Sequence, residues 1–220
     1  MDRLISRHLR ISCALALCLG LLAGCGRAAA QQENQPKPQK FENNALSVMP
    51  LAGQQVALLP ITMVVADTAI EADSAWAAYR GRALALARSD SLIVEEMQMR
   101  GPEVVWVTPN ELRKMARRAP GMLSDPGTLG QAMLRAPNLE RVPDGLGASL
   151  RKLVAIAGGR MVFVPAALAF SRAPDGRPRA DLSLVLVDTR RNTIAWRSQA
   201  VGHGADPDAA LRAALTTVFP

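Results

Sequence analysis

The spacing of apolar and polar residues changes several times along the chain, and each spacing indicates one kind of element. The apolar run at 56–65 (VALLPITMVV) is typical of a buried strand. Pro60 cannot donate a hydrogen bond to a sheet, so a bulge or a free edge is expected there. From Ala69 to Met99 apolar residues recur at helical spacing, with a break expected near 89–91 and a stop at Gly101-Pro102.

The middle of the chain alternates short strand and helix signals. A strand is expected at 104–107, and it leads directly into Thr108-Pro109-Asn110-Glu111, which has a capping residue, a first-turn proline and a capping-box glutamate. Asp125-Pro126 is a second proline-led helix start. The next helix is expected from Asp144 to Ala157, and Gly158-Gly159 is a typical helix stop rather than a phosphate loop.

The last part of the chain predicts three strands, at 161–170, 180–188 and 193–201, joined by short turns. Short turns favour an antiparallel meander. Asp206-Pro207 then begins a closing helix. The order of elements predicts an α/β fold, with a mixed sheet that contains a C-terminal antiparallel meander and is covered by helices.

The first residues predict export. Three arginines precede an apolar stretch at 11–23, which is only about half as long as a membrane-spanning helix. The stretch ends in Leu22-Ala23-Gly24-Cys25 and resembles a bacterial lipoprotein signal, in which the cysteine receives a lipid and the chain is cut just before it. The resemblance implies a signal peptide at 1–24 and lipidation at Cys25. An ordinary secretory signal and an uncleaved apolar anchor are the alternatives.

Two further segments follow the signal peptide. Residues 25–53 are polar and irregular after the cysteine, which predicts a flexible linker that spans roughly 25–30 Å on average. Residues 54–220 are long enough for one core and are expected to form a single α/β domain.

The scarcity of cysteine and histidine excludes several kinds of chemistry. Cys13, Cys18 and Cys25 all lie at or before the expected cut, and of the two histidines only His203 follows it. A disulfide framework and Cys/His metal sites are therefore not expected, and no cofactor is predicted. His203, between two glycines, is expected to lie in a loop before the last helix, as an ordinary or a catalytic residue.

The net charge of +7 comes mostly from arginines that are spread along the chain, and aromatic residues make up only 4% of it. This pattern does not favour nucleic-acid binding. It is compatible with acidic partners, with lipid headgroups, or with solubility alone. A cluster at Arg113, Lys114, Arg117 and Arg118 is expected on the outer side of a helix, either to bind an anionic partner or to be solvated.

Two sets of side chains are candidates for function. Asp67, Glu71 and Asp73 lie near a strand-to-helix junction, where carboxylates perform acid–base work in hydrolases or simply favour the start of a helix. Trp76, Trp106 and Trp196 are expected in the core, and an exposed one would be a partner hot spot.

The pattern of the strands resembles a known family. The run Leu-Leu-Pro-Ile at 58–61, the run Leu-Val-Leu-Val-Asp-Thr at 184–189 and the run Thr-Ile-Ala-Trp at 193–196 are similar to bacterial lipoproteins with a TolB N-terminal-like domain. These include relatives of the curli-secretion channel and activators of penicillin-binding proteins. The resemblance covers 54–218. It departs from the secretion channel, because no long alternating segments are present to form extra membrane-crossing hairpins.

Taken together, these features predict a membrane-anchored envelope lipoprotein that acts as a non-enzymatic protein-interaction or assembly module. Gly26 stands where inner-membrane retention signals often have aspartate, which favours the outer membrane, facing the periplasm. The expected partners are the membrane, through the lipid, and an envelope protein; the oligomeric state stays open. The alternatives are a subunit of an envelope export or transport complex and a carboxylate-dependent hydrolase of envelope polymers.

Overall fold

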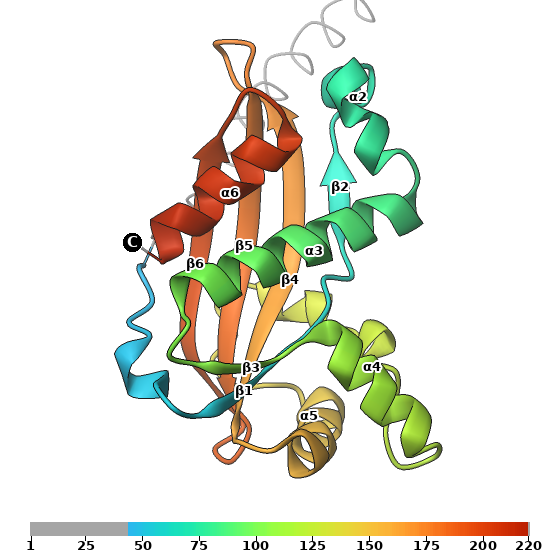
Figure 1. The fold of residues 1–220 in the computed structure, drawn as a ribbon, viewed down its shortest axis with the longest axis vertical. Coiled ribbons are helices and arrows are strands. Elements are labelled where there is room, and N and C mark those ends of the chain that lie inside the picture. The colour runs from blue at the N-terminus through green and yellow to red at the C-terminus, as the bar shows by residue number, and fades with distance from the viewer. Residues whose placement is uncertain (1–43, 220) are drawn as a thin grey trace, which may run out of the picture. The chain divides into compact units, whose positions relative to one another are not determined.

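A six-stranded mixed sheet forms the centre of the domain in the computed structural model, which describes residues 44–219 (Figure 1). Along the sheet the order is β3-β1-β4-β5-β6, and β2 also pairs with β4. β1 runs parallel to β3 and β4, whereas β4, β5 and β6 are antiparallel. The predicted mixed sheet with a C-terminal meander is therefore confirmed. The strands are β1 (Gln55–Leu58), β2 (Val64–Ala66), β3 (Val105–Val107), β4 (Met161–Arg172), β5 (Pro178–Asp188) and β6 (Thr193–His203).

Helices connect the short strands and close the chain. The α-helices are α2 (Thr68–Glu71), α3 (Arg82–Arg100), α4 (Pro109–Arg118), α5 (Asp144–Ala157) and α6 (Pro207–Val218). Short 3-10 helices are η1 (Met49–Leu51), η2 (Ser74–Tyr79), η3 (Pro126–Thr128) and η4 (Gln131–Arg135).

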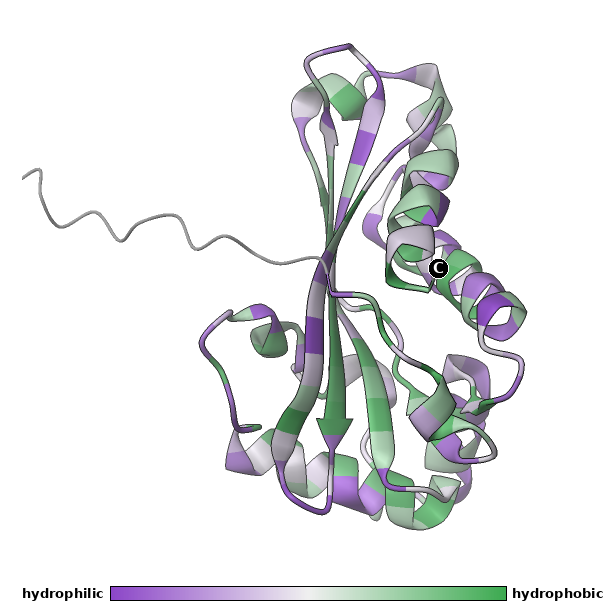
Figure 2. Cartoon of the chain, turned by 90° about the vertical axis from the view of Figure 1, so that its left-hand side faces the viewer, coloured by the Kyte–Doolittle hydropathy of each residue, from purple (hydrophilic) through white to green (hydrophobic). Residues whose placement is uncertain are grey.

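The two faces of the sheet bury separate cores. Because side chains alternate along a strand, Leu182, Leu184 and Leu186 face the core beneath α3 and α6. Val185 and Val187 point the other way, into the core beneath α4 and α5. Figure 2 shows helices on both sides of the sheet at the end where α5 lies.

The apolar run at 56–65 forms two strands rather than one. Pro60 lies between β1 and β2, both of which pair with β4. β4 has a register shift of its own between Pro165 and Ala167. The irregularity expected at Pro60 is thus an interruption of the strand, and it places residues 59–63 beside α3.

Three expectations about local structure are corrected. The helical region does not break near 89–91, because α3 is continuous from Arg82 to Arg100, and the chain breaks instead between α2 and η2 and before Gly81. His203 ends strand β6 rather than lying in a loop. Residues 44–53, assigned to the linker, pack on the domain: Leu46 and Leu51 are buried, and the Leu46 N–H donates to Val218 O at 2.9 Å.

Candidate functional site

A groove of about 770 Å³ opens between α3 and the start of α4. Its base is formed by residues of the β1–β2 connection, which the interruption at Pro60 brings next to α3. Its polar rim includes Arg82, Glu95 and Gln98, all from α3. The apolar residues that line it are Ile61, Ala83, Leu86, Ala87, Val94 and Pro109.

An ion pair closes the inner end of this groove. Asp90, buried in the middle of α3, accepts a hydrogen bond from the Ile61 N–H at 2.7 Å and another from Arg113 Nη2 at 2.9 Å. Arg113 also donates to Asn110 Oδ1 at 3.2 Å. The carboxylate therefore connects α3, the β1–β2 connection and α4.

Burial raises the pKa of Asp90, and the hydrogen bonds from Arg113 and Ile61 oppose this rise. A carboxylate in this position holds its place because both of its oxygens have donors. Of the predicted basic cluster, Arg113 thus belongs to the groove, whereas Lys114, Arg117 and Arg118 are exposed.

The start of α4 forms the other wall of the groove. The Thr108 side chain accepts from the Glu111 N–H at 3.4 Å, and Glu111 accepts from the Thr108 N–H at 2.7 Å. The predicted capping box is confirmed, with Pro109 in the first turn. These bonds fix the direction in which α4 leaves β3, and so fix the width of the groove.

The predicted carboxylate cluster serves local structure, because two of its members cap helices. Asp67 caps α2 by accepting from the Ile70 N–H at 2.8 Å, and Asp73 caps η2 by accepting from the Ala75 N–H at 2.9 Å. Arg172 joins the two, because its N–H donates to Asp67 and its Nη2 donates to Asp73. Glu71 is exposed on α2.

The charge state of this cluster also disfavours acid catalysis. Backbone hydrogen bonds, with that from Ile70 the largest, lower the pKa of Asp67, and the Ala75 N–H and Arg172 lower the pKa of Asp73. A glycoside hydrolase needs one carboxyl with a raised pKa to donate a proton. Neither of these aspartates meets that condition.

The tryptophans pack as core anchors. Trp76 stacks on Tyr79 with ring centroids 4.7 Å apart, and Trp106 donates from Nε1 to Gly101 O at 2.9 Å. Trp196 is partly buried against Phe163, and its indole N–H has no hydrogen-bond partner among residues 44–219. None of the three is an exposed hot spot.

His203 is exposed, and the glycines beside it have a packing role. A Cβ atom on Gly202 would overlap the backbone of Ala210 and Ala214, and one on Gly204 would overlap Ala209 and Ala210. The glycines therefore let α6 lie directly on the end of β6. This motif, singled out for its histidine, is explained by contact between a helix and a strand.

Within 44–219 no group of three or more His, Cys, Asp or Glu side chains is placed to hold a metal ion. In the same part of the chain, no helix is both long enough and apolar enough to cross a membrane. The proposed lipidation site Cys25 lies outside the described residues.

Sequence reasoning missed the groove, because its lining comes from α3, the β1–β2 connection and α4. One signal was available. Asp90 interrupts the apolar pattern of α3, and this polar residue was interpreted as a helix break. In the structure it is a buried residue of a continuous helix, and Arg113 is its partner. A polar residue within a helical pattern indicates either a helix break or a buried polar contact. Only the position of a partner residue on a distant element distinguishes the two.

Comparison with known proteins gives structural neighbours only. No protein-family model matches the chain, and no curated protein matches it. The C-terminal domain of LpoB from Salmonella enterica is similar with a TM-score of 0.40 and 12% identity, over 70% of this chain and 84% of that chain. Lipoprotein GNA1162 from Neisseria meningitidis gives a TM-score of 0.33 and 14% identity, over 69% and 81%.

A PelC dodecamer from Paraburkholderia phytofirmans is a third neighbour, with a TM-score of 0.35 and 12% identity, over 81% of this chain and 96% of that chain. One of these neighbours, GNA1162, is itself a lipoprotein, the class of protein that the sequence resembles. Identities and TM-scores of this size transfer no residue role, partner or oligomeric state to this chain.

Proposed function

We propose that this chain is an envelope lipoprotein, anchored by lipid at Cys25, whose domain binds another envelope protein without catalysing a reaction. The signal 1–24 is removed, the linker holds the domain near the bilayer, and the anchor lies in the outer membrane, facing the periplasm. The groove between α3 and α4 is the protein-binding site. That groove is the observation that carries the proposal.

The anchor is supported by the residues around Cys25, which match a lipoprotein signal at each position before the cysteine. Acyl chains contribute about 0.8 kcal/mol of membrane affinity for each buried methylene. Replacing the thiol with a hydroxyl, in Cys25→Ser, is expected to move the protein out of the detergent phase and the membrane fraction. If partitioning is unchanged in this variant, the anchor is wrong.

The groove is suited to an apolar side chain on a segment of the partner. Leu86 and Val94 are partly buried in its walls, and the rim offers both a cation, Arg82, and an anion, Glu95. Protein-binding sites gain most of their affinity from a few such apolar anchors with a polar rim around them. The Asp90–Arg113 pair keeps the base of the groove rigid, which reduces the ordering cost of binding.

A charge placed inside the groove tests this site. Ala87→Glu adds a carboxylate among the lining residues without removing a core side chain, because Ala87 is exposed. We expect it to weaken partner binding about tenfold or more, as loss of one apolar anchor does. Met99→Glu is the matched control, since Met99 is 59% exposed on the same helix and does not line the groove.

Binding is measured by photo-crosslinking in intact cells, with p-benzoylphenylalanine at position 91 in the groove or at position 99 outside it. The expected result is a discrete adduct from position 91 only, which disappears in the Ala87→Glu background and persists in the Met99→Glu background. The same adducts from both positions, or none from position 91, would refute the groove as the binding site.

A further inference from the structure

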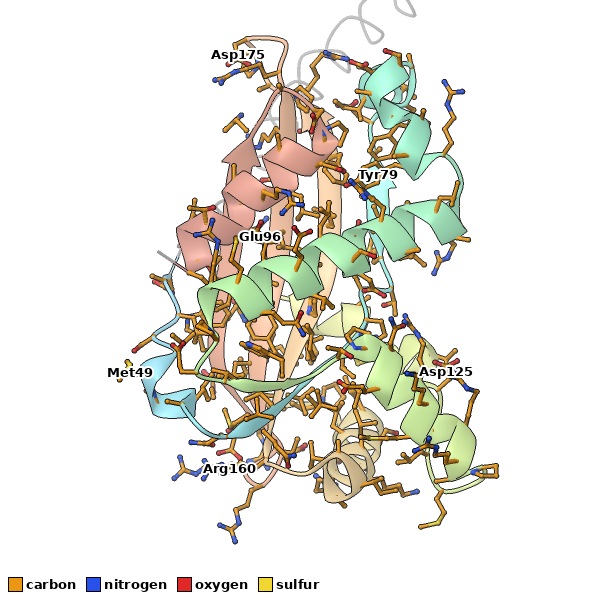
Figure 3. All side chains as sticks on the ribbon, viewed as in Figure 1. Met49, Tyr79, Glu96, Asp125, Arg160 and Asp175 are labelled. Carbon is orange, nitrogen blue, oxygen red and sulfur yellow. The ribbon has the colours of Figure 1, made fainter. Side chains whose placement is uncertain are left out.

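Five cationic side chains gather at the end of the domain where α5 and the β5–β6 turn lie, and we call them the basic end. Each of them is exposed to solvent. Figure 3 shows Arg160 at this end of the domain, next to the β5–β6 turn and α5. The members are Arg151 and Lys152 on α5, Arg160 after that helix, and Arg190 and Arg191 in the turn.

Hydrogen bonds hold the three segments of the basic end together. The Thr189 N–H and Oγ1 both donate to Arg160 O, at 3.1 and 2.7 Å. Arg151 Nη1 donates to Asn192 Oδ1 at 3.3 Å, which connects α5 to the turn. The cations are therefore fixed on one surface although they lie far apart in sequence.

One carboxylate offsets part of this charge. Asp188 is buried and forms an ion pair with Arg160. Its other oxygen accepts from the N–H groups of Arg190 and Arg191 at 3.0 and 3.3 Å, so it serves the turn and does not pair with those two guanidinium groups. Among residues 44–219, Arg151, Lys152, Arg190 and Arg191 have no carboxylate within ion-pairing distance.

An exposed apolar residue lies among these cations. Ile156 is 43% exposed on α5, one turn after Lys152 and four residues before Arg160. Side chains at i and i+4 share a helix face, so Ile156 and Lys152 point to the same side. A surface with cations around an exposed aliphatic residue is typical of contact with a bilayer, where headgroups meet the charges and acyl chains meet the aliphatic group.

We propose that the basic end binds the anionic phospholipid surface of the membrane to which the chain is anchored. The proposal rests on the anchoring at Cys25. Because residues 44–53 pack on the domain, a linker of residues 26–43 keeps the domain within roughly 20–25 Å of the bilayer on average. Each cation near an anionic bilayer strengthens binding by about fivefold. Four cations without carboxylate partners thus orient a domain that the lipid anchor already holds nearby, and α5 faces the membrane.

Two lysines within residues 44–219 make this orientation measurable. Lys152 belongs to the basic end, whereas Lys114 lies on the exposed side of α4. The full lipid-anchored chain is reconstituted on phosphatidylcholine vesicles, with or without about 30% phosphatidylglycerol, and brief acetylation of each lysine is quantified by mass spectrometry. Lys152 is expected to react about fivefold more slowly on the anionic vesicles, and Lys114 about equally on both. About 1 M salt is expected to abolish the difference.

Two double variants with equal charge change provide the control. Arg190→Gln with Arg191→Gln is expected to reduce the protection of Lys152 to less than about twofold, because it removes two of the four cations. Arg117→Gln with Arg118→Gln on α4 is expected to leave the protection unchanged. The comparison between vesicle types uses the unaltered chain, so it gives an answer even if a variant folds poorly.

The outcomes separate this proposal from the anchor. Flotation with pure phosphatidylcholine vesicles reports the lipid at Cys25, whereas protection of Lys152 that depends on phosphatidylglycerol reports the basic end. Equal reactivity of Lys152 on both vesicles, or equal protection of Lys114, would overturn the proposal whether or not the chain floats. Protection by an acidic peptide such as polyglutamate, with none on anionic vesicles, would also overturn it and would assign the surface to an acidic protein.

Discussion

At the scale of single residues, Asp90 connects three parts of the fold: α3, the β1–β2 connection and α4. It is a buried carboxylate in the middle of a helix, and both of its oxygens are bound by donors from other elements. Such a group is costly to bury but still more costly to leave half paired. The geometry of the groove therefore depends on this side chain more than on any of the alanines that line it.

Asp90→Ala is expected to lower the free energy of unfolding by about 2 kcal/mol, because the Ile61 N–H and the Arg113 guanidinium each lose a charged partner. Urea unfolding followed by circular dichroism measures the change. Asp175→Ala is the control, since Asp175 is exposed in a turn and its ion pair within residues 44–219 is with the exposed Arg177. A surface pair of this kind contributes little, and equal effects of the two substitutions would contradict the role given to Asp90.

At the scale of elements, α6 depends on glycine for its place on the sheet. Gly202 and Gly204 let the helix backbone approach β6 more closely than any side chain would allow. Beneath this contact α6 buries Leu211, Ala214 and Leu215. The backbones of α6 and β6 are therefore so close that a single added methyl group at this contact would force them apart.

Gly202→Ala is expected to destabilise the domain by about 1–3 kcal/mol, because the added methyl group forces α6 away from β6. Gly145→Ala, in the first turn of α5, is expected to stabilise it by about 0.4–1 kcal/mol, since a Cβ there meets nothing within 4 Å. Thermal unfolding of both variants measures the two shifts. If both substitutions shift the midpoint temperature in the same direction, the contact between Gly202 and α6 does not limit the position of the helix.

Elements with local signals at both ends were predictable from sequence. The helix expected from Asp144 to Ala157 has those bounds. It ends there because Gly158 and Gly159 have positive φ, and both lie so close to Gln55 that a Cβ atom would overlap it. The break expected at 89–91 was wrong, because the polar residue there finds its partners in Ile61 and Arg113. The groove escaped prediction for the same reason: no local pattern reports a pairing between distant elements.

At the scale of the whole domain, the pKa values of most of the shifted aspartates among residues 44–219 are lowered, and the buried Asp90 is the exception. Among residues 44–219, the pKa is lowered for five aspartates and raised for Asp90. For Asp208, burial alone would raise the pKa, but hydrogen bonds from Arg88 and Tyr79 outweigh it. The pKa of Tyr79 is raised, mainly by burial and also by its hydrogen bond to Asp208.

These shifts predict loss of stability in acid. A carboxyl with a lowered folded pKa stabilises the domain above its unfolded pKa of about 3.8, and that contribution is lost as the pH falls through the lower folded value. Asp90 acts in the opposite direction but is outnumbered. Urea unfolding is expected to show a lower free energy of unfolding at pH 3 than at pH 7.

Asp188→Asn should show a smaller difference between the two pH values, because it removes one of the titrating groups. Burial would raise the pKa of Asp188, but hydrogen bonds from the Arg191 N–H and the Arg160 guanidinium lower it overall. An unchanged difference in this variant would mean that Asp188 titrates alike in the folded and unfolded chain.

The contact of residues 44–46 with the domain has a mechanical consequence. The Asn44 N–H binds Ser198 Oγ at 3.1 Å on β6, and the Leu46 N–H binds the carbonyl at the end of α6. Under the proposed anchoring, any pull on the tether is transmitted first to the closing strand and helix of the fold. These few hydrogen bonds are expected to break at low force, before the strands of the sheet separate. When single molecules are stretched from position 25, a small early extension should therefore precede the main unfolding event.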